Sequence, residues 1–342
     1  MNIDWLQKPA RPINGDWYVD AKFKQDHLTK PVRSLGRLEE IAIKMSALHG
    51  CARPSVDKIQ MVVFAADHGI AAENIAAFAP MTTLEMMRNF SAGGAAISVL
   101  AKELGADVEV INTGTLTAHE NLQSVIVERI AAGTKNFTQQ AAMTAAECAE
   151  ALNIGQQAVL RAKGNQADIF IAGEMGVANS LSATAIVCAC LNESAQAIMG
   201  GNSELNETEL QSCVAAIKQA LQRHQTQLDS PLSILQTVGG FEIAAMTGAY
   251  IACAQRGLPI LVDGFVASAA ALLAIKILPA TRQWMLFSQV SADLGHQQII
   301  QAMKAKPLLN LDIRLGEGSG AAVAVSIIRL ACRLHTKMAV FS

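Results

Sequence analysis

Short apolar runs alternate along the chain with longer segments whose apolar residues recur at helical spacing. The short runs, rich in β-branched residues, predict strands at 59–65, 107–112, 124–130, 168–173, 259–263, 284–287 and 308–313. The longer segments predict helices at 34–50, 83–104, 144–163, 181–191, 207–224, 242–256, 268–277, 297–304 and 321–335. Continuous apolar strands alternating with helices indicate an α/β protein, whose parallel sheet is covered on both faces.

The first 33 residues do not follow this pattern. They are of mixed polarity and contain three prolines, so we expect them to lie extended across the surface or a partner. The first periodic helix follows directly, with Ser34 able to cap its start and Gly50 able to end it.

Composition narrows the class of protein. Hydrophobic residues make up 51% of the 342 residues and charged residues 16%, which excludes a disordered chain and suggests that some surface is buried in an oligomer. The net charge of −2 argues against nucleic-acid binding. The N-terminus lacks the apolar region of a signal peptide, and charges interrupt the most apolar stretch, 258–278, so we expect a cytoplasmic protein without a membrane span.

Candidate metal ligands do not cluster in the sequence. The seven cysteines form no CxxC pair, which fits buried thiols in a reducing compartment better than disulfides or a zinc site. Asp67 and His68 are adjacent, so on a strand they point in opposite directions, and no second pair has ligand spacing. We therefore expect no metal, and a structural or substrate-ordering role for these two residues.

Glycine and polar residues follow five of the predicted strands. The segments are DHG at 67–69, TGT at 113–115, GEMG at 173–176, DG at 263–264 and RLGEGSG at 314–320. Ligands of open α/β sheets bind beyond the carboxyl ends of the strands. The five segments are therefore predicted to surround one site.

Glu317 is the first candidate for chemistry, because it lies between Gly316 and Gly318 just before a predicted helix. Glycines let the backbone approach a ligand closely, so an isolated carboxylate there suggests work on a substrate atom. The alternative is a tight turn with a glutamate that stabilises the helix start.

A second group of candidates follows the strand at 168–173. Glu174 and Gly176 precede a helix whose first turn carries Asn179 and Ser180, donors that suit a phosphate or a ribose. The alternative is a simple helix cap. Asp263, at another strand end, suits ribose hydroxyls or the capping of a neighbouring loop.

As a set, these segments resemble the nicotinate-nucleotide–dimethylbenzimidazole phosphoribosyltransferase family. The resemblance rests on DHG, NFSAGGAAI, GEMG, VGGFEIAAMTGA, LVDGF and RLGEGSGAA in this order, and runs from residue 34 to the end. It implies a Rossmann-like, mostly parallel sheet domain at 59–320. It also implies a small helical domain formed by 1–58 and 321–342, a homodimer, and no metal or other cofactor.

The activity implied by the resemblance is transfer of the 5-phosphoribosyl group of nicotinate mononucleotide to 5,6-dimethylbenzimidazole or a related base. The products are α-ribazole 5′-phosphate and nicotinate, for the lower-ligand nucleotide of cobalamin. Glu317 matches the general base, and Glu174 is a second carboxylate for the sugar. The substrate-binding residues implied or suggested are Gly176, Asn179, Ser180, Asp263, Ser291, Leu315, Gly316, Gly318, Ala79 and Glu85.

The chain departs from the family pattern around both substrates. Ala79 stands where a serine is common and Glu85 where a glutamine is usual, which leaves the preferred base open. Cys213 stands in place of a phosphate-binding lysine, for which Arg314 or Lys218 could substitute. Two alternatives therefore remain: a non-catalytic paralogue that binds a nucleotide or base, and a nucleoside hydrolase using Glu174 and Glu317 as a carboxylate pair.

Overall fold

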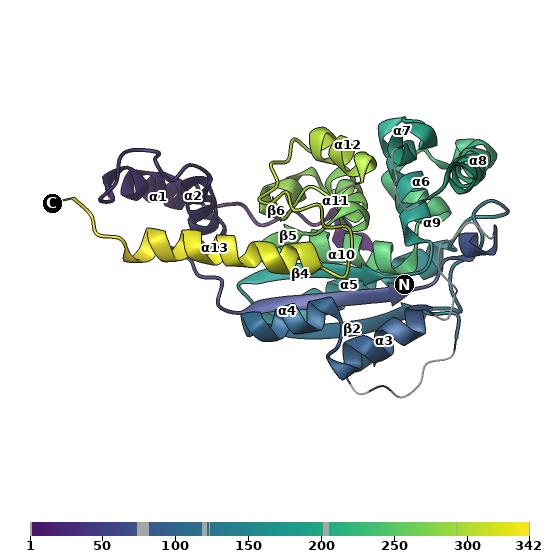
Figure 1. Ribbon diagram of the computed structural model, residues 1–342, viewed down its shortest axis with the longest axis horizontal. Coiled ribbons are helices and arrows are strands. Elements are labelled where there is room, and N and C mark those ends of the chain that lie inside the picture. The colour runs from purple at the N-terminus through teal and green to yellow at the C-terminus, as the bar shows by residue number, and fades with distance from the viewer. Residues whose placement is uncertain are drawn as a thin grey trace.

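Six parallel strands form the sheet of the computed structural model, which describes residues 2–73, 82–117, 122, 124–200, 205–291 and 293–341 (Figure 1). The strands are β1 (Ile59–Ala66), β2 (Asp107–Gly114), β3 (Val125–Val127), β4 (Ile169–Met175), β5 (Ile260–Val262) and β6 (Met285–Phe287). Their order is β3-β2-β1-β4-β5-β6, and every neighbouring pair is parallel. This is the strand order of Rossmann-type sheets, and it confirms the predicted α/β class.

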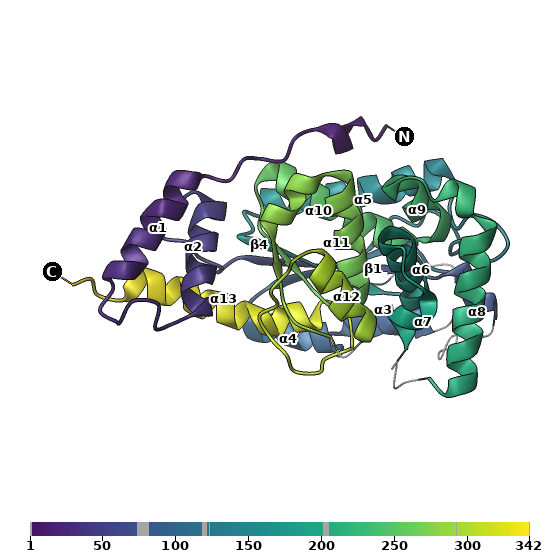
Figure 2. The same cartoon turned by 90° about the horizontal axis from the view of Figure 1, so that it is seen from above.

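Helices cover both faces of this sheet (Figures 1 and 2). The helices α5 (Ala145–Gly164), α10 (Phe241–Arg256) and α11 (Phe265–Ile277) lie on one face, and α3 (Thr82–Ala92), α4 (Ala96–Leu104) and α13 (Ser319–Lys337) on the other. The helices α6 (Asn179–Leu191), α9 (Pro231–Val238) and α12 (Leu294–Ala302) pack on α11, and α7 (Ala195–Met199) and α8 (Glu207–Arg223) pack on α6. The strand order reverses between β1 and β4, so a ligand crevice is expected beyond their carboxyl ends.

Helices from the N-terminal and C-terminal parts of the chain pack together away from this crevice. The helices α1 (Gly15–His27) and α2 (Arg37–His49) pack together, and α2 also packs on α13 (Figure 2). Leu28 pairs with Val340, and Gln25 Nε2 lies 2.9 Å from His335 Nδ1. Among the described residues, no helix has both the length and the apolarity needed to cross a membrane.

Two predictions near the N-terminus are wrong. The segment 1–33 contains α1, which was missed because its apolar residues do not gather on one face of the helix; Asn14 caps it by accepting from Asp16 N and Trp17 N. Ser34 does not cap α2, because Gly36 occupies the cap position without a side-chain bond. Gly50 does end α2, in a left-handed conformation.

Two further predictions fail where glycine or positive φ interrupts the pattern. The helix predicted at 83–104 is two helices, α3 and α4, since Gly93 adopts a φ of +79° between them. The segment 308–313 is no strand: only Leu309 pairs, with Gln289, and Asp312 has a φ of +54°. Apolar alternation alone does not show these backbone turns.

The closest helix packing is that of α5 on α10, where backbone meets backbone. A methyl group on Gly155 would overlap the carbonyl oxygen of Ala245, and one on Gly248 would overlap that of Leu152. Gly164, at the end of α5, has nothing within 4 Å of such a methyl group.

We therefore expect Gly155→Ala to lower the free energy of unfolding by about 2 kcal/mol, because overpacking outweighs the better helix propensity of alanine. Gly164→Ala is the matched control and should leave stability unchanged or raise it slightly. Urea denaturation of both variants measures the difference. Equal stability of the two variants would contradict the packing argument.

Candidate active site

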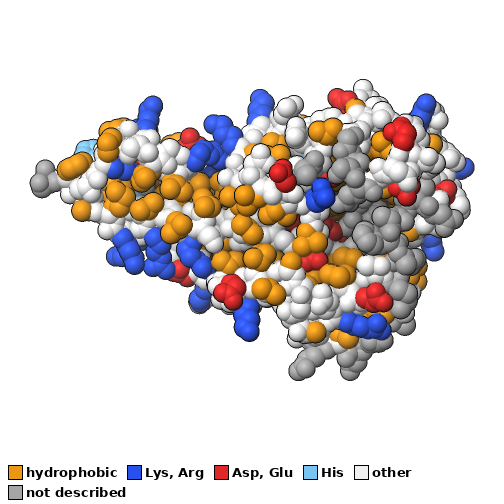
Figure 3. Space-filling view, in the orientation of Figure 1, with side chains coloured by type: hydrophobic (Ala, Val, Ile, Leu, Met, Phe, Trp, Pro, Cys, Tyr) orange, Lys and Arg blue, Asp and Glu red, His pale blue; other side chains and the backbone are white. Residues whose placement is uncertain are grey.

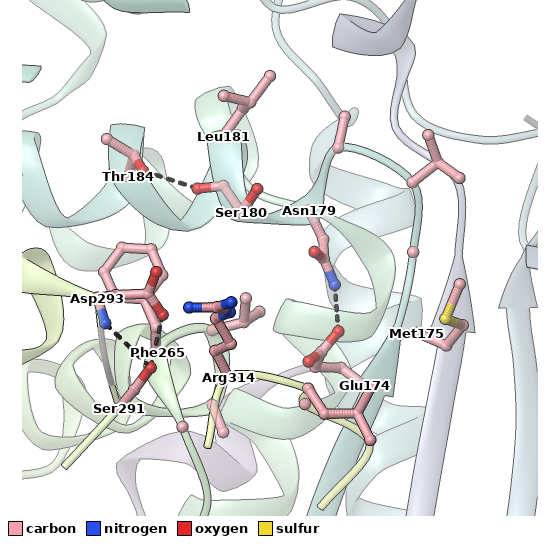
Figure 4. Close-up of a pocket in the computed structure, with 18 of the residues that line it drawn as sticks. Glu174, Met175, Asn179, Ser180, Leu181, Thr184, Phe265, Ser291, Asp293 and Arg314 are labelled. Atoms are coloured by element: carbon pink, nitrogen blue, oxygen red, sulfur yellow. Dashed lines mark hydrogen bonds between the residues drawn. The ribbon is translucent and has the colours of Figure 1, made fainter. Parts of the chain in front are cut away.

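A cavity of about 400 Å³ lies at the carboxyl ends of the strands, within the usual range for small-molecule sites. Its walls come from the segment after β4, the start of α6, the segment after β6 and the loop before α13 (Figure 4). Of the residues singled out from the sequence, it brings together Glu174, Gly176, Asn179, Ser180, Ser291, Leu315, Gly316 and Glu317. The strand-end segments after β4 and before α13 therefore do surround one site.

Glu317 sits in a run of three left-handed residues. Its φ is +61°, between Gly316 at +80° and Gly318 at +86°. Its carboxylate accepts a hydrogen bond from the Ile97 N–H at the start of α4, while Oε2 has no hydrogen-bond partner among the described residues. Burial raises the pKa of Glu317, the Ile97 N–H lowers it, and the nearby Asp263 charge raises it. One buried carboxylate oxygen is thus left to accept a proton from a ligand.

Asp263 holds this loop in place from the end of β5. Its Oδ2 accepts from Gly318 N at 3.1 Å and its Oδ1 from Ala321 N at 2.8 Å. Burial raises the pKa of Asp263 to about 6, against the lowering effect of the backbone N–H groups that it accepts from. Asp263 and Gly318 do not line the cavity. Their hydrogen bonds fix the loop that carries Glu317.

The loop that carries Glu317 also requires a glycine at position 173 of β4. A methyl group on Gly173 would overlap the carbonyl oxygen of Glu317, and one on Gly316 would overlap the Glu174 carboxyl group. The two glycines allow β4 and the loop to approach closely, which places the two glutamates on one wall of the cavity.

Glu174 is held by Asn179, whose Nδ2 donates to Glu174 Oε2 across the cavity wall (Figure 4). Burial, and after it the charge of Glu242, raises the pKa of Glu174 to about 8 against the lowering effect of the Asn179 hydrogen bond. At neutral pH the carboxyl is therefore mostly protonated, and a cation beside it would favour its ionised form.

The opposite wall offers hydroxyl groups and a cation. Ser291 Oγ donates to Asp293 Oδ2 at 2.6 Å, and Ser291 N donates to His296 Nδ1 at 2.8 Å. Burial lowers the pKa of His296 to about 4, so this ring is neutral. The guanidinium of Arg314 projects between this wall and Glu174, and Ser180 lies above it (Figure 4). Arg314 thus gives this side of the cavity a cation, beside the carboxylate of Asp293.

His68, Glu242 and Asp67 lie outside the lining of the cavity. His68 Nε2 is 2.6 Å from Glu242 Oε1 and its Nδ1 is 2.8 Å from Ser182 Oγ, with His68 and Glu242 side chains fully buried. Asp67 accepts from Thr83 Oγ1 at 2.6 Å and from Leu116 N at 2.7 Å. Within the described part of the chain, no group of three His, Cys, Asp or Glu side chains could hold a metal ion.

The residues implied for the base pocket are not all in view. Ala79 lies outside the described residues. Glu85 is exposed on α3 and does not line the cavity, whereas Thr82 and Met86 of the same helix do. Sequence reasoning missed the Ile97 N–H, although the glycine pair of NFSAGGAAI marked the start of its helix. Cys213 lines the cavity.

Comparisons with known proteins agree with this geometry. The model of a family described as Phosphoribosyltransferase matches residues 10–342. The nicotinate-nucleotide–dimethylbenzimidazole phosphoribosyltransferases of Pseudomonas aeruginosa and Azotobacter vinelandii are each 46% identical to this chain, covering 100% of it and 97% of the relative. A crystal structure of the enzyme of that name from Thermus thermophilus superimposes with a TM-score of 0.91 at 36% identity, covering 96% of this chain and 98% of the other.

Both the family match and the identity extend over almost the whole chain, including the loop of Glu317 and both ends. The chain belongs to the nicotinate-nucleotide–dimethylbenzimidazole phosphoribosyltransferase family.

Proposed function

We propose that this chain transfers the 5-phosphoribosyl group of nicotinate mononucleotide to dimethylbenzimidazole or a related base, giving α-ribazole 5′-phosphate and nicotinate. The observation that carries the proposal is Glu317, which lines the cavity from its glycine loop and has one buried carboxylate oxygen without a hydrogen-bond partner among the described residues. The names and full-length similarity of the relatives support it.

The chemistry follows from what a carboxylate at this position does to a benzimidazole. One ring nitrogen carries a proton and the other a lone pair. As the lone pair attacks C1′ of the ribose, Glu317 takes the proton from the first nitrogen, and the C1′–N bond breaks with its electron pair going to nicotinate. Because the pyridinium becomes a neutral pyridine, the leaving group needs no acid. Base assistance of this kind is worth about 10²–10⁴-fold.

Glu174 supplies the electrostatic part of the reaction. The sugar acquires positive charge as the old bond breaks, and a buried carboxylate nearby stabilises that charge. The positive charge of the pyridinium favours the ionised form of Glu174 over the protonated form. The ionised carboxylate in turn attracts the cationic ring of the nucleotide.

Arg314 takes the phosphate of the nucleotide in this proposal, together with the Ser180 hydroxyl group and with Ser291 once its hydroxyl turns from Asp293 Oδ2 to the phosphate. All three line the cavity, with Arg314 between Ser291 and Glu174 and Ser180 above it (Figure 4). The guanidinium thereby supplies the charge that a lysine at position 213 provides elsewhere in the family, since Cys213 cannot.

We also propose that the protein is a homodimer that works in the cytoplasm, and that 1–58 and 321–342 form its small helical domain. Figure 3 shows hydrophobic side chains gathered in a band along α13 and across the middle of one face. Val99 of α4 is 51% exposed and Leu330 of α13 is 57% exposed, and a band of such residues marks an association surface. All seven cysteines are free thiols, which fits a reducing compartment.

Glu317→Gln should lower kcat by about 10²–10⁴-fold, because the amide cannot accept the ring proton, while the KM for nicotinate mononucleotide changes little. The assay separates products by chromatography and mass spectrometry with a panel of bases. Glu103→Gln, an exposed residue of α4, is the control and should behave as wild type.

Other outcomes of this assay point elsewhere. Ribose 5-phosphate formed by the wild type without any base would favour the hydrolase. Tight binding of the nucleotide with no product from any base would favour the non-catalytic paralogue.

Binding of nicotinate mononucleotide near pH 7 should release a proton from Glu174. Its pKa of about 8 keeps the group protonated, and the pyridinium charge lowers that pKa, so release fades as the pH rises above about 9. Calorimetry in buffers of different ionisation enthalpy measures the release. Glu174→Gln should abolish this component and Glu103→Gln should keep it; an unchanged release in Glu174→Gln would show that another group supplies the proton.

Arg314→Gln should raise the KM for nicotinate mononucleotide by roughly 10- to 100-fold, the value of lost charge-assisted hydrogen bonds. Adding Cys213→Lys, which restores the family's cation, should recover part of that loss in steady-state kinetics. A KM that stays at the wild-type value in Arg314→Gln would remove Arg314 from the phosphate site.

A further inference from the structure

A second cavity, of about 200 Å³, lies between α2, the edge strand β6 and residues 304–308. Its basic lining residues are Arg37, Lys44, Arg282, Lys304 and Lys306, and its acidic lining residue is Glu40. It shares no lining residue with the active-site cavity. The chain has only 27 Lys and Arg and a net charge of −2, so five cations around one small cavity are a local concentration of charge.

The floor of this cavity consists of cations bonded only to neutral groups. Lys44 Nζ donates to the Met285 carbonyl oxygen at 2.6 Å. Arg282 donates through Nε to Met303 O at 2.8 Å and through Nη2 to Lys304 O at 3.0 Å. Carbonyl oxygens satisfy these donors but do not neutralise their charge. These hydrogen bonds tie the 303–308 segment to the sheet. That structural role does not explain why so many charged side chains gather here.

The environment of Lys44 reflects this concentration of positive charge. Burial, together with the charges of Arg282 and Arg37, lowers the pKa of Lys44 to about 7. No carboxylate among the described residues offsets these effects. An anion in the cavity would favour the ammonium form of Lys44, so its affinity should fall as the pH rises through about 7.

The rim provides little compensation. Glu40 is paired with Arg37 Nη1 at 2.6 Å, and its side chain is 58% exposed, so water screens its charge. Arg37 Nη2 donates to the Lys306 carbonyl oxygen at 2.8 Å. Lys304 and Lys306 also line the cavity and are exposed. The basic residues around the cavity therefore outnumber the one acidic residue.

We infer that this cavity is a binding site for a small multivalent anion, a phosphate or pyrophosphate group, separate from the active site. Its volume suits such a group and is small for a whole nucleotide. The hydrogen bonds described above use Nε and Nη2 of Arg282 and one proton of Lys44 Nζ. Nη1 of Arg282 and the other two protons of Lys44 remain as donors for an anion. The Arg282 guanidinium lies 5.0 Å from the centre of the Phe287 ring, which orients its donors for tetrahedral oxygens.

The test uses Lys44 as its own reporter in the full chain. Trace acetylation by acetic anhydride near pH 7.5, read lysine by lysine by mass spectrometry, gives the rate at each amine. Pyrophosphate should slow the labelling of Lys44 by about tenfold, because it fills the cavity and favours the unreactive ammonium form. Lys22 of α1, whose side chain is 53% exposed, is the internal control and should not change.

Two comparisons decide between a site and general screening. The double variant Lys304→Gln and Lys306→Gln should need roughly fivefold more pyrophosphate for half protection, because two nearby charges are lost. In the active-site variant Arg314→Gln, pyrophosphate should protect Lys44 to the same extent as in the wild type. Absence of protection, equal protection by chloride at the same ionic strength, or unchanged protection in the double variant would overturn the inference.

Discussion

The architecture of the active site depends on the buried carboxylate of Asp263. It accepts hydrogen bonds from the N–H groups of Gly318 and Ala321, and so joins the end of β5 to the loop of Glu317 and to α13. Residues 316–318 all have positive φ, a conformation that costs a glutamate about 1–2 kcal/mol. A loop of this kind needs external partners. Asp263 supplies the acceptors, and Gly173 supplies the space below the Glu317 carbonyl. The strained residue is also the one whose carboxylate reaches the cavity.

Several carboxylates lie close together around Glu174 at the active site. The pKa of Glu174 is raised by three nearby carboxylates, those of Glu242, Asp263 and Glu317. Glu242 also has the imidazole of His68 beside it. A cation at this point would relieve the repulsion, and in the proposed reaction the pyridinium nucleotide and the ribosyl transition state supply that charge. In the same proposal, Arg314 and the serine hydroxyl groups that line the cavity bind the anionic end of the molecule. The proposed substrate then lies in one direction in the cavity, with its cationic part at Glu174 and its phosphate at Arg314.

Apolar continuity was enough to predict the six strands of the sheet and most helices, because a parallel sheet buried on both faces needs uninterrupted apolar runs. It also predicted a seventh strand at 308–313, where a positive φ at Asp312 interrupts the extended backbone, and it missed α1, whose apolar residues do not gather on one face. For the site, the position of polar residues at strand ends was sufficient to bring Glu174, Asn179 and Glu317 together. The capping of a neighbouring loop, one of the two roles predicted for Asp263, is confirmed by its hydrogen bonds to Gly318 N and Ala321 N. The Ile97 N–H on Glu317 was out of reach, since backbone amides distant in sequence have no signature of their own.

The two cavities share structural elements although they share no lining residue. Phe287 in β6 lines the basic cavity, and the chain continues from it to Gln289 and Ser291 at the active site. Leu308 also lines the basic cavity; its N–H donates to the Phe287 carbonyl oxygen at 3.0 Å, and its neighbour Leu309 pairs with Gln289. These contacts connect the 304–308 segment to Gln289 at the active site. The side chain of Gln289 lies beside Gly320 and Asp263, and Asp263 accepts from Gly318 N in the loop of Glu317. The basic cavity and the loop of Glu317 are therefore connected through Gln289.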